Sequence, residues 1–530
     1  MEFKFGGSAT NQKTVLGHPS GLFVLFFTEM WERFSYYGMR ALLVLFLTAS
    51  ILDEGGWGWE RSDATLLYGW YIGLVYLTPI VGGWIADKFL GYRRSVVLGA
   101  FIMTLGHASM ALEIVTDLFF YLGLVLLILG NGLFKPNISS IVGKLYKSNG
   151  KEKDAGYTIF YMGINAGAFL GILLCGYIGE KVGWHYGFGL AGIFMFFGML
   201  QFYFGQKIFG KIGLSPQQLV DFDDALEDSV EDTWEQVEEV VEGVQKSKVD
   251  RDRITVIAVF ALFTTFFWWA FEQAGSSMTI FAADYTDRAL EGSAATTFTV
   301  INSIITLVPL LVITWVLLML FKQTFGKYAL SNIWLGSSFV IIWGIVIWML
   351  MREFNAENTE VPASWFSVLN SLFIILFAPV FSKIWESKLN PAGPIKFGIG
   401  LILLGLGFAI LSFGSATIPD GAKTASVSMI FLILAYLFHT LGELCISPVG
   451  LSYVSKLAPL KLVGMMFGIW FISNFLAGVI GGWTASYIDP ISEKYGLDVF
   501  FLIFTVIPMS AGLIMFVFNK KLIKMMHGIR

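Results

Sequence analysis

Long apolar runs alternate with short charged or glycine- and proline-containing turns along almost the whole chain. Each run approaches or exceeds about twenty residues, the length that an α-helix needs to cross a hydrocarbon core about 30 Å thick. A helix of a water-soluble protein would instead carry an apolar stripe on one face. The pattern predicts fourteen membrane-spanning helices, at residues 20–48, 64–86, 94–113, 117–143, 156–179, 185–208, 254–283, 296–321, 331–351, 362–385, 395–414, 424–454, 462–487 and 497–519.

One polar stretch, residues 210–253, is far longer than the other breaks and is strongly acidic. It separates an N-terminal six-helix bundle at residues 1–209 from a C-terminal block of eight spans at residues 254–530. Such an order is typical of two-bundle transporters with a site at the midplane. The block holds two spans more than symmetry needs, a surplus pair at about 296–351. Apolar residues spaced by three or four between 226 and 244 allow an amphipathic cytoplasmic helix, and a solvated linker is the alternative.

Composition supports a membrane protein. Of the 530 residues, 56% are hydrophobic and 14% are charged, against about 25% charged in an ordinary soluble domain. The net charge of −4 gives no indication of nucleic-acid binding. Cys175 and Cys445 both lie within apolar runs and do not support a disulfide framework. The first apolar run contains Glu29, Glu32 and Arg33, which a cleaved signal sequence would not tolerate, so we expect a retained helix.

Basic residues gather in alternate loops. They follow the second, fourth, tenth and twelfth predicted spans and recur in the C-terminal tail, whereas the opposite loops are poorer in lysine and arginine. Under the positive-inside rule, these loops and both termini are cytoplasmic. We therefore expect a multi-pass protein of the inner (cytoplasmic) membrane.

Charged residues within spans are the candidate chemistry, because a charge at the bilayer centre costs at least about 2.5–3.5 kcal/mol. In the first span, acids, bases and tyrosines spaced by three and four form one ionisable helix face. Two carboxylates near one guanidinium leave one acid without a full partner, and that acid can exchange a proton. A static ion pair between helices is the alternative. The face comprises Glu29, Glu32, Arg33, Tyr36, Tyr37 and Arg40.

Three further spans contain isolated charges. Lys135 stands beside a proline in the fourth span, where it can attract a carboxylate or snorkel to the interface. Glu272 follows two tryptophans in the seventh span. It can be a second proton site or a gate, or it can form a structural hydrogen bond between helices. Glu443 is the only acid in a long apolar run and suits a substrate ammonium group. His439, one turn earlier, is more typical of a packed histidine than of a proton relay.

Together these charges predict two facing walls. The N-terminal half supplies Arg33 and Lys135, and the C-terminal half supplies Glu443. A short zwitterion such as a peptide would fit across the gap. Asn165 and Asn370 add neutral donors and acceptors, although either can instead bond a neighbouring helix.

Five sequence blocks resemble the proton-coupled oligopeptide transporters, a branch of the major facilitator superfamily. They are EMWERFSYYGMRALL, which matches the family's ExxER signature, and GGWIADKFLGYRRS, FYMGINAGAFLG, FWWAFEQAG and ELCISPVGLSYVSKLAP. Their order and their spread over nearly the whole chain support the resemblance. It implies an all-α membrane fold of two six-helix bundles plus two extra helices. It also implies a symporter that imports di- and tripeptides by alternating access, driven by the proton gradient.

The resemblance assigns residues to roles. Glu29, Glu32, Arg33 and Glu272 match residues of proton coupling. A second set matches residues of the peptide pocket, with Arg33 and Lys135 near the peptide carboxylate and Asn370 and Glu443 near the amino end. That set is Arg33, Tyr36, Tyr37, Tyr76, Lys135, Asn165, Trp269, Asn370, Glu443 and Trp470. The implied coupling ion is the proton, with no cofactor or metal, and we expect the protein to function as a monomer.

One departure and two alternatives remain open. Bacterial members often carry their extra helices between the bundles, whereas here the surplus pair follows the FEQ span. This position makes Asn302 a weaker pocket candidate than Asn370. A relative that carries nitrate or another small solute is the main alternative, although a lone Glu443 would repel an anion. A membrane enzyme is disfavoured because HExxH, GxSxG and GxxxxGK[ST] motifs do not occur.

Overall fold

The structure is a computed structural model that describes residues 3–52, 54–147, 150–215, 217–219, 248–356, 358–388, 390–459 and 462–529. Most of the predicted linker, including its amphipathic pattern at 226–244, lies outside the described residues.

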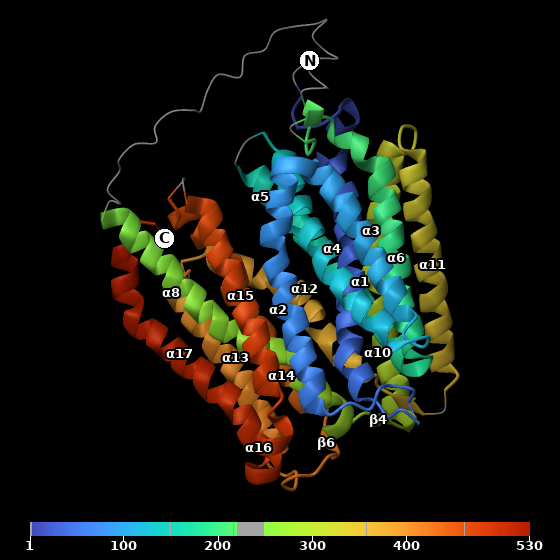
Figure 1. Cartoon of the computed structure of the whole chain (residues 1–530), viewed down its shortest axis with the longest axis vertical. Coiled ribbons are helices and arrows are strands. Elements are labelled where there is room, and N and C mark those ends of the chain that lie inside the picture. The colour runs from blue at the N-terminus through green and yellow to red at the C-terminus, as the bar shows by residue number, and fades with distance from the viewer. Residues whose placement is uncertain are drawn as a thin grey trace, which may run out of the picture.

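Long helices make up most of the described chain (Figure 1). They are α1 (Ser20–Thr48), α2 (Arg61–Ile85), α3 (Gly91–Ala111), α4 (Asp117–Lys144), α5 (Lys151–Lys181), α6 (Trp184–Gly205), α8 (Lys248–Phe271), α10 (Gly292–Thr324), α11 (Ala329–Phe354), α12 (Val368–Glu386), α13 (Gly393–Ser415), α14 (Ile430–Leu457), α15 (Val463–Ala485) and α17 (Leu497–Met525).

Short elements join these helices. The helical ones are α9 (Ser277–Ile280), α16 (Ile488–Tyr495), η1 (Ala9–Gln12), η2 (Ala86–Leu90), η3 (Gln206–Phe209), η4 (Glu272–Gly275), η5 (Phe281–Tyr285) and η6 (Ala363–Ser367). The two-residue strands pair as β1 (Thr14–Val15) with β2 (His18–Pro19), β3 (Thr286–Asp287) with β6 (Val427–Ser428), and β4 (Ala289–Leu290) with β5 (Thr359–Glu360).

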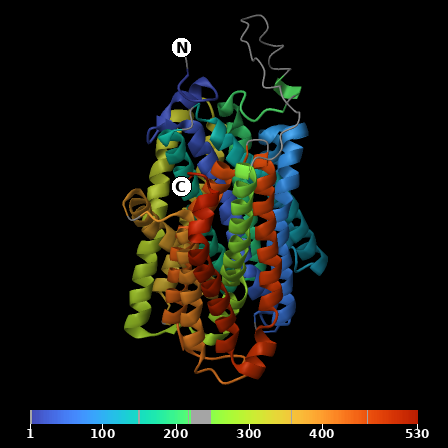
Figure 2. The same cartoon turned by 90° about the vertical axis from the view of Figure 1, so that its left-hand side faces the viewer.

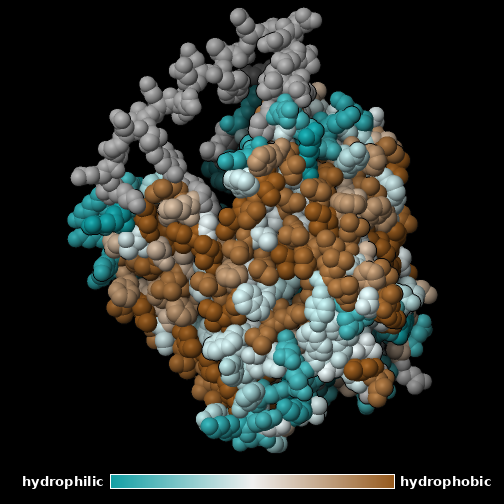
Figure 3. Space-filling view, viewed as in Figure 1, coloured by the Kyte–Doolittle hydropathy of each residue, from teal (hydrophilic) through white to brown (hydrophobic). Residues whose placement is uncertain are grey.

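Among the described residues, 12 helical segments are long and apolar enough to cross a membrane. One of them, Arg61–Ala111, contains both α2 and α3. The ionisable helix α1 is not among the 12. On the face shown in Figure 3, a broad hydrophobic band lies between two more polar ends. The predicted all-helical membrane protein is therefore confirmed, with 12 candidate spans.

The helices form two groups. Within the first, α1 packs on α5 and α6, and α3 packs on α4 and α6; within the second, α13 packs on α14 and α17, and α8 packs on α15. The groups meet where α2 crosses α15 and where α5 contacts α12. At the first crossing, a Cβ added to Gly69 would lie 2.6 Å from the Cα of Gly482. Small residues thus allow two membrane helices to approach closely.

The surplus pair, α10 and α11, lies against the first group although it follows α8 in the chain. Helix α11 packs on α6 (Figure 1). Ser331 donates a hydrogen bond to the carbonyl of Gln201 at 2.7 Å, and Tyr177 donates one to Glu353 at 2.7 Å. The pair therefore covers the outside of the first group.

Candidate functional site

The ionisable face of α1 forms one buried cluster. The Nε of Arg33 lies 2.7 Å from a carboxylate oxygen of Glu29 and 2.8 Å from one of Glu32, and these side chains are at most 5% exposed. The spacing of three and four residues brings both acids to one guanidinium group. Asn131 of α4 donates a hydrogen bond to the other oxygen of Glu32 at 3.1 Å. Two carboxylates thus compete for a single nitrogen, an arrangement that a proton on either acid would relieve.

A cavity of about 320 Å³ lies between the two groups of helices. Its first wall comes from α1, α2, α4 and α5, and its second wall from α8, η4, α12 and α14. The predicted site residues that line it are Glu29, Arg33, Tyr37, Tyr76, Lys135, Asn165, Glu272, Asn370 and Glu443. Glu32 lies behind this lining and is completely buried.

Lys135 supplies a free cation to the first wall. Its ammonium lies 4.5 Å from the ring centroid of Tyr76, a cation–π arrangement. Among the described residues, no carboxylate forms an ion pair with it. A proline inside α4, at position 136, immediately follows Lys135. Lys135 is therefore placed to receive an anionic group that enters the cavity.

Glu443 supplies the anion of the second wall. One of its oxygens accepts a hydrogen bond from the side-chain amide of Asn370 at 2.8 Å, and the same amide donates to Thr440 at 3.1 Å. The Glu443 side chain is 8% exposed and has no described ion pair. His439 packs on Phe408 with ring centroids 4.4 Å apart, as expected for a packed histidine. The two walls thus present opposite charges across one cavity.

Glu272 joins the groups through a contact that sequence reasoning missed. Arg40 of α1 forms an ion pair with it at 2.5 Å and also donates to the hydroxyl of Tyr68 at 2.8 Å. Helix α8 ends at Phe271 just before this acid, and a Cβ on Gly275 would lie within 1.9 Å of the Tyr68 hydroxyl. Only glycine allows that approach. The spacing of Arg40 on α1 was visible in the sequence, but its partner on a distant helix was not.

Two predicted pocket residues lie elsewhere. Trp269 donates its indole N–H to Thr484 at 3.0 Å and packs on Phe504, and it is absent from the cavity lining. Trp268 lines the cavity in its place, because neighbouring residues of a helix point about 100° apart. Tyr36 is 4% exposed and packs on Tyr37, also outside the lining.

A second pocket of about 640 Å³ continues the cavity toward the turn between α4 and α5. It shares Tyr76, Lys135 and Trp268 with the cavity, and it is lined by Trp470, another predicted site residue. Asn165 lies in the cavity lining with its amide bonded to the carbonyl of Tyr161 at 3.0 Å. Asn302 of α10 is absent from both linings. A continuous space thus leads from the charged walls toward one end of the molecule.

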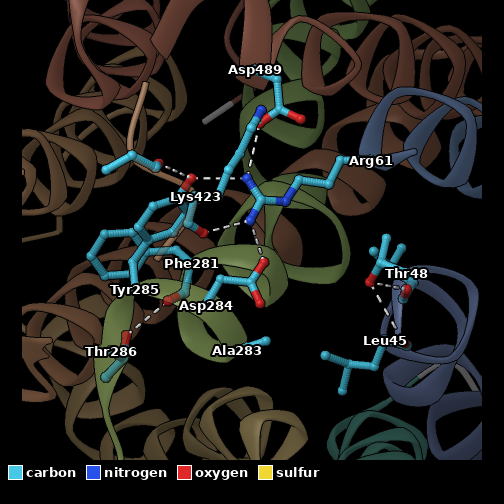
Figure 4. A network of polar contacts seen from close by, with 12 residues as sticks. Leu45, Thr48, Arg61, Phe281, Ala283, Asp284, Tyr285, Thr286, Lys423 and Asp489 are labelled. Carbon is cyan, nitrogen blue, oxygen red and sulfur yellow. Dashed lines mark hydrogen bonds and ion pairs between the residues drawn. The ribbon is translucent and has the colours of Figure 1, made fainter. Parts of the chain in front are cut away.

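Toward the other end of the molecule, a charge network surrounds Arg61 at the start of α2 (Figure 4). Its guanidinium lies 2.6 Å from Asp284 in η5 and 2.9 Å from Asp489 in α16. Arg61 also donates a hydrogen bond to the backbone carbonyl of Lys423 at 2.9 Å, and the ammonium of Lys423 forms an ion pair with Asp489 at 3.3 Å. Partial burial alone would lower the pKa of Lys423. The nearby carboxylates of Glu493 and Asp489 have the larger effect, so the pKa is raised. The network joins the first group to the second.

Comparisons with known proteins agree with this geometry. The PTR2 model, which describes the POT family, matches residues 93–222 and 335–501. The chain is 32% identical to the peptide transporter YePEPT of Yersinia enterocolitica subsp. palearctica, over 89% of each chain. It is 31% identical to the di-/tripeptide transporter of Lactococcus lactis subsp. cremoris, over 98% of this chain and 99% of the relative.

Solved structures show the same architecture. A crystal structure of the peptide transporter POT in complex with sulfate is similar with a TM-score of 0.72 and 30% identity, over 97% of both chains. A POT family transporter in complex with a thioalcohol conjugated peptide is similar with a TM-score of 0.73 and 27% identity, over 96% of this chain and 97% of the other. Because the family model matches more than half of the 530 residues and full-length relatives exceed 30% identity, this chain belongs to the POT family of transporters.

Proposed function

We propose that this chain is a proton-coupled symporter that imports di- and tripeptides by alternating access. The observation that carries the proposal is the pair of oppositely charged walls, with Arg33 and Lys135 on one side and Glu443 with Asn370 on the other. A peptide has one terminal carboxylate and one terminal ammonium, so it complements both walls at once. Relatives that are di-/tripeptide transporters support the same substrate class.

The α1 cluster suits proton coupling. While Glu29 and Glu32 are both ionised, they share the nitrogen of Arg33. When one acid is protonated, the other acid and Arg33 form an ion pair with no net charge. The charge that faces the substrate carboxylate changes as a result. The ion pair between Arg40 and Glu272 crosses between the two groups, so a proton on Glu272 would weaken a contact that has to break when the groups separate. In this scheme Glu29, Glu32, Arg33 and Glu272 couple proton movement to peptide movement.

We further propose fourteen spans. The segment Arg61–Ala111 has 51 residues and would extend ~77 Å as one straight helix, more than twice the hydrocarbon core. Gly91, the first residue of α3 directly after η2, has a φ of 72°, which permits the turn between two spans. Dividing this segment gives thirteen spans. Helix α1 is the fourteenth span, because its charged side chains face protein rather than lipid. Both termini are cytoplasmic in this topology. The two bundles come from residues 1–209 and 254–530, on either side of the 210–253 linker. Because a single chain contains the whole site, the protein functions as a monomer.

Uptake into proteoliposomes tests the proposal. Labelled dialanine should accumulate inside only when the outside is more acidic, and unlabelled dipeptides should compete with it. Nitrate at the same concentration should not compete, because Glu443 repels anions. Competition by nitrate without competition by dipeptides would instead favour a small-anion transporter.

A further inference from the structure

A groove of about 640 Å³ runs along the outer surface between α8 and α17, away from the charged cavity. Figure 2 shows these two helices side by side on one face of the molecule. Apolar side chains dominate the lining, and several are open to the surroundings: Leu262 is 55% exposed, Val506 52% and Ile514 46%. Because this surface lies within the hydrophobic band, the groove faces lipid rather than water.

The groove is longer than the hydrocarbon part of one leaflet. Val506 and Lys521 both line it, and the 15 helical steps from one to the other correspond to ~22 Å of helix. Half of a hydrocarbon core is about 15 Å thick. An acyl chain that enters from one membrane surface can therefore lie along the groove for its whole length.

Basic side chains gather at only one end of the groove. Lys521 is part of the lining, and Lys524 follows one turn later on α17. Arg251 lies one turn before the lining residue Thr255, on the same face of α8. In the described part of the chain, none of these three basic side chains forms an ion pair. The nearby Asp252 is instead occupied by His527 at 2.9 Å.

We infer that this groove binds one anionic phospholipid, with an acyl chain between α8 and α17 and the phosphate against Lys521 and Arg251. Charge complementarity selects this occupant, since unpaired basic groups at a membrane surface attract anionic headgroups. The acyl chain of a zwitterionic lipid would make the same apolar contact, but its headgroup has no net charge and would not be attracted to the basic side chains. The site lies in the leaflet on the same side as the C-terminal end of α17, and its occupancy ties together the first and last helices of the second group.

Native mass spectrometry of the full-length protein in detergent tests the inference. The probes are phosphatidylglycerol and phosphatidylcholine with identical acyl chains, titrated separately. The wild type should bind phosphatidylglycerol more tightly. Lys521→Ala should weaken phosphatidylglycerol binding about fivefold and leave phosphatidylcholine unchanged, as expected for one basic group near the membrane surface. Lys327→Ala, which removes an exposed lysine from the turn between α10 and α11, is the matched control and should change neither.

A second variant separates the groove from general surface charge. Ser510 lines the groove and is exposed to lipid, so Ser510→Trp should fill the space without disturbing the core and weaken both lipids. Equal affinity of the wild type for the two lipids would overturn the inference. Equal effects of Lys521→Ala and Lys327→Ala, or unchanged lipid binding in Ser510→Trp, would do the same.

Discussion

Replacing Glu443 with glutamine isolates the charge of the second wall from its shape. The side chain is 8% exposed, and one oxygen accepts a hydrogen bond from Asn370 at 2.8 Å. Glutamine has nearly the same size and keeps an oxygen that can accept this bond. The substitution therefore removes the negative charge while leaving the contact within the wall intact.

The expected loss of peptide affinity follows from the contact that Glu443 would make with a peptide ammonium. A hydrogen bond to a charged group contributes about 1.5–3 kcal/mol. At about 1.4 kcal/mol per tenfold change, the wild type should prefer dialanine to N-acetyl-dialanine by about 10- to 150-fold. Because the acetylated peptide has no ammonium, Glu443→Gln should weaken only the free peptide, and the preference should largely disappear.

Competition against labelled dialanine in counterflow measures this preference without a proton gradient. The ratio of the two inhibition constants is compared between the wild type, Glu443→Gln and Glu291→Gln. The last variant makes the same replacement at an exposed position before α10 and should retain the wild-type ratio. If Glu443→Gln still discriminates as strongly as the wild type, another group holds the peptide amino end and the assignment is wrong.

Three other predictions test separate parts of the structure. Lys135→Gln should reduce affinity for dialanine about tenfold and have less effect on dialanine amide, as the same counterflow competition will show; equal losses would place Lys135 away from the peptide carboxylate. Trp268→Ala should raise the peptide concentration needed for half-maximal uptake, whereas Trp269→Ala should chiefly lower the melting temperature, and the reverse pattern would contradict the placement of the two rings. Gly482→Leu should destabilise the protein by ~1–3 kcal/mol in thermal unfolding because its Cβ would lie 2.5 Å from Gly69, whereas Gly468→Ala, which meets nothing within 4 Å, should be nearly neutral.

Much of the helical layout could be predicted from the sequence, because uninterrupted apolar runs have few other structures available in a membrane. The predicted first span, residues 20–48, coincides with α1 (Ser20–Thr48). The predicted convergence of Arg33, Lys135 and Glu443 also matches the cavity lining. Each of these residues is a charge within an apolar run, and lipid exposure would be so costly that a shared interior chamber was the physical expectation.

The remaining features depend on contacts between distant segments. The sequence could not indicate which of two adjacent tryptophans faces the cavity, since the rotation of α8 about its own axis decides it. It gave no spacing signal for the Arg61 network, whose acids lie in η5 and α16, 223 and 428 positions further along the chain. The attachment of α11 to α6 was likewise invisible, because apolar periodicity does not specify a partner. Asn131 was a missed signal, since it lies one turn before Lys135 on α4 and bonds Glu32.

The central claim is that buried acids on α1 couple a proton to the peptide. The most direct test is Glu32→Gln in proteoliposomes, assayed both for dialanine counterflow and for uptake under an inward proton gradient. We predict that counterflow persists, because the peptide walls are intact, while accumulation against a concentration gradient is lost. Accumulation at the wild-type level would contradict the assignment of Glu32 to proton coupling.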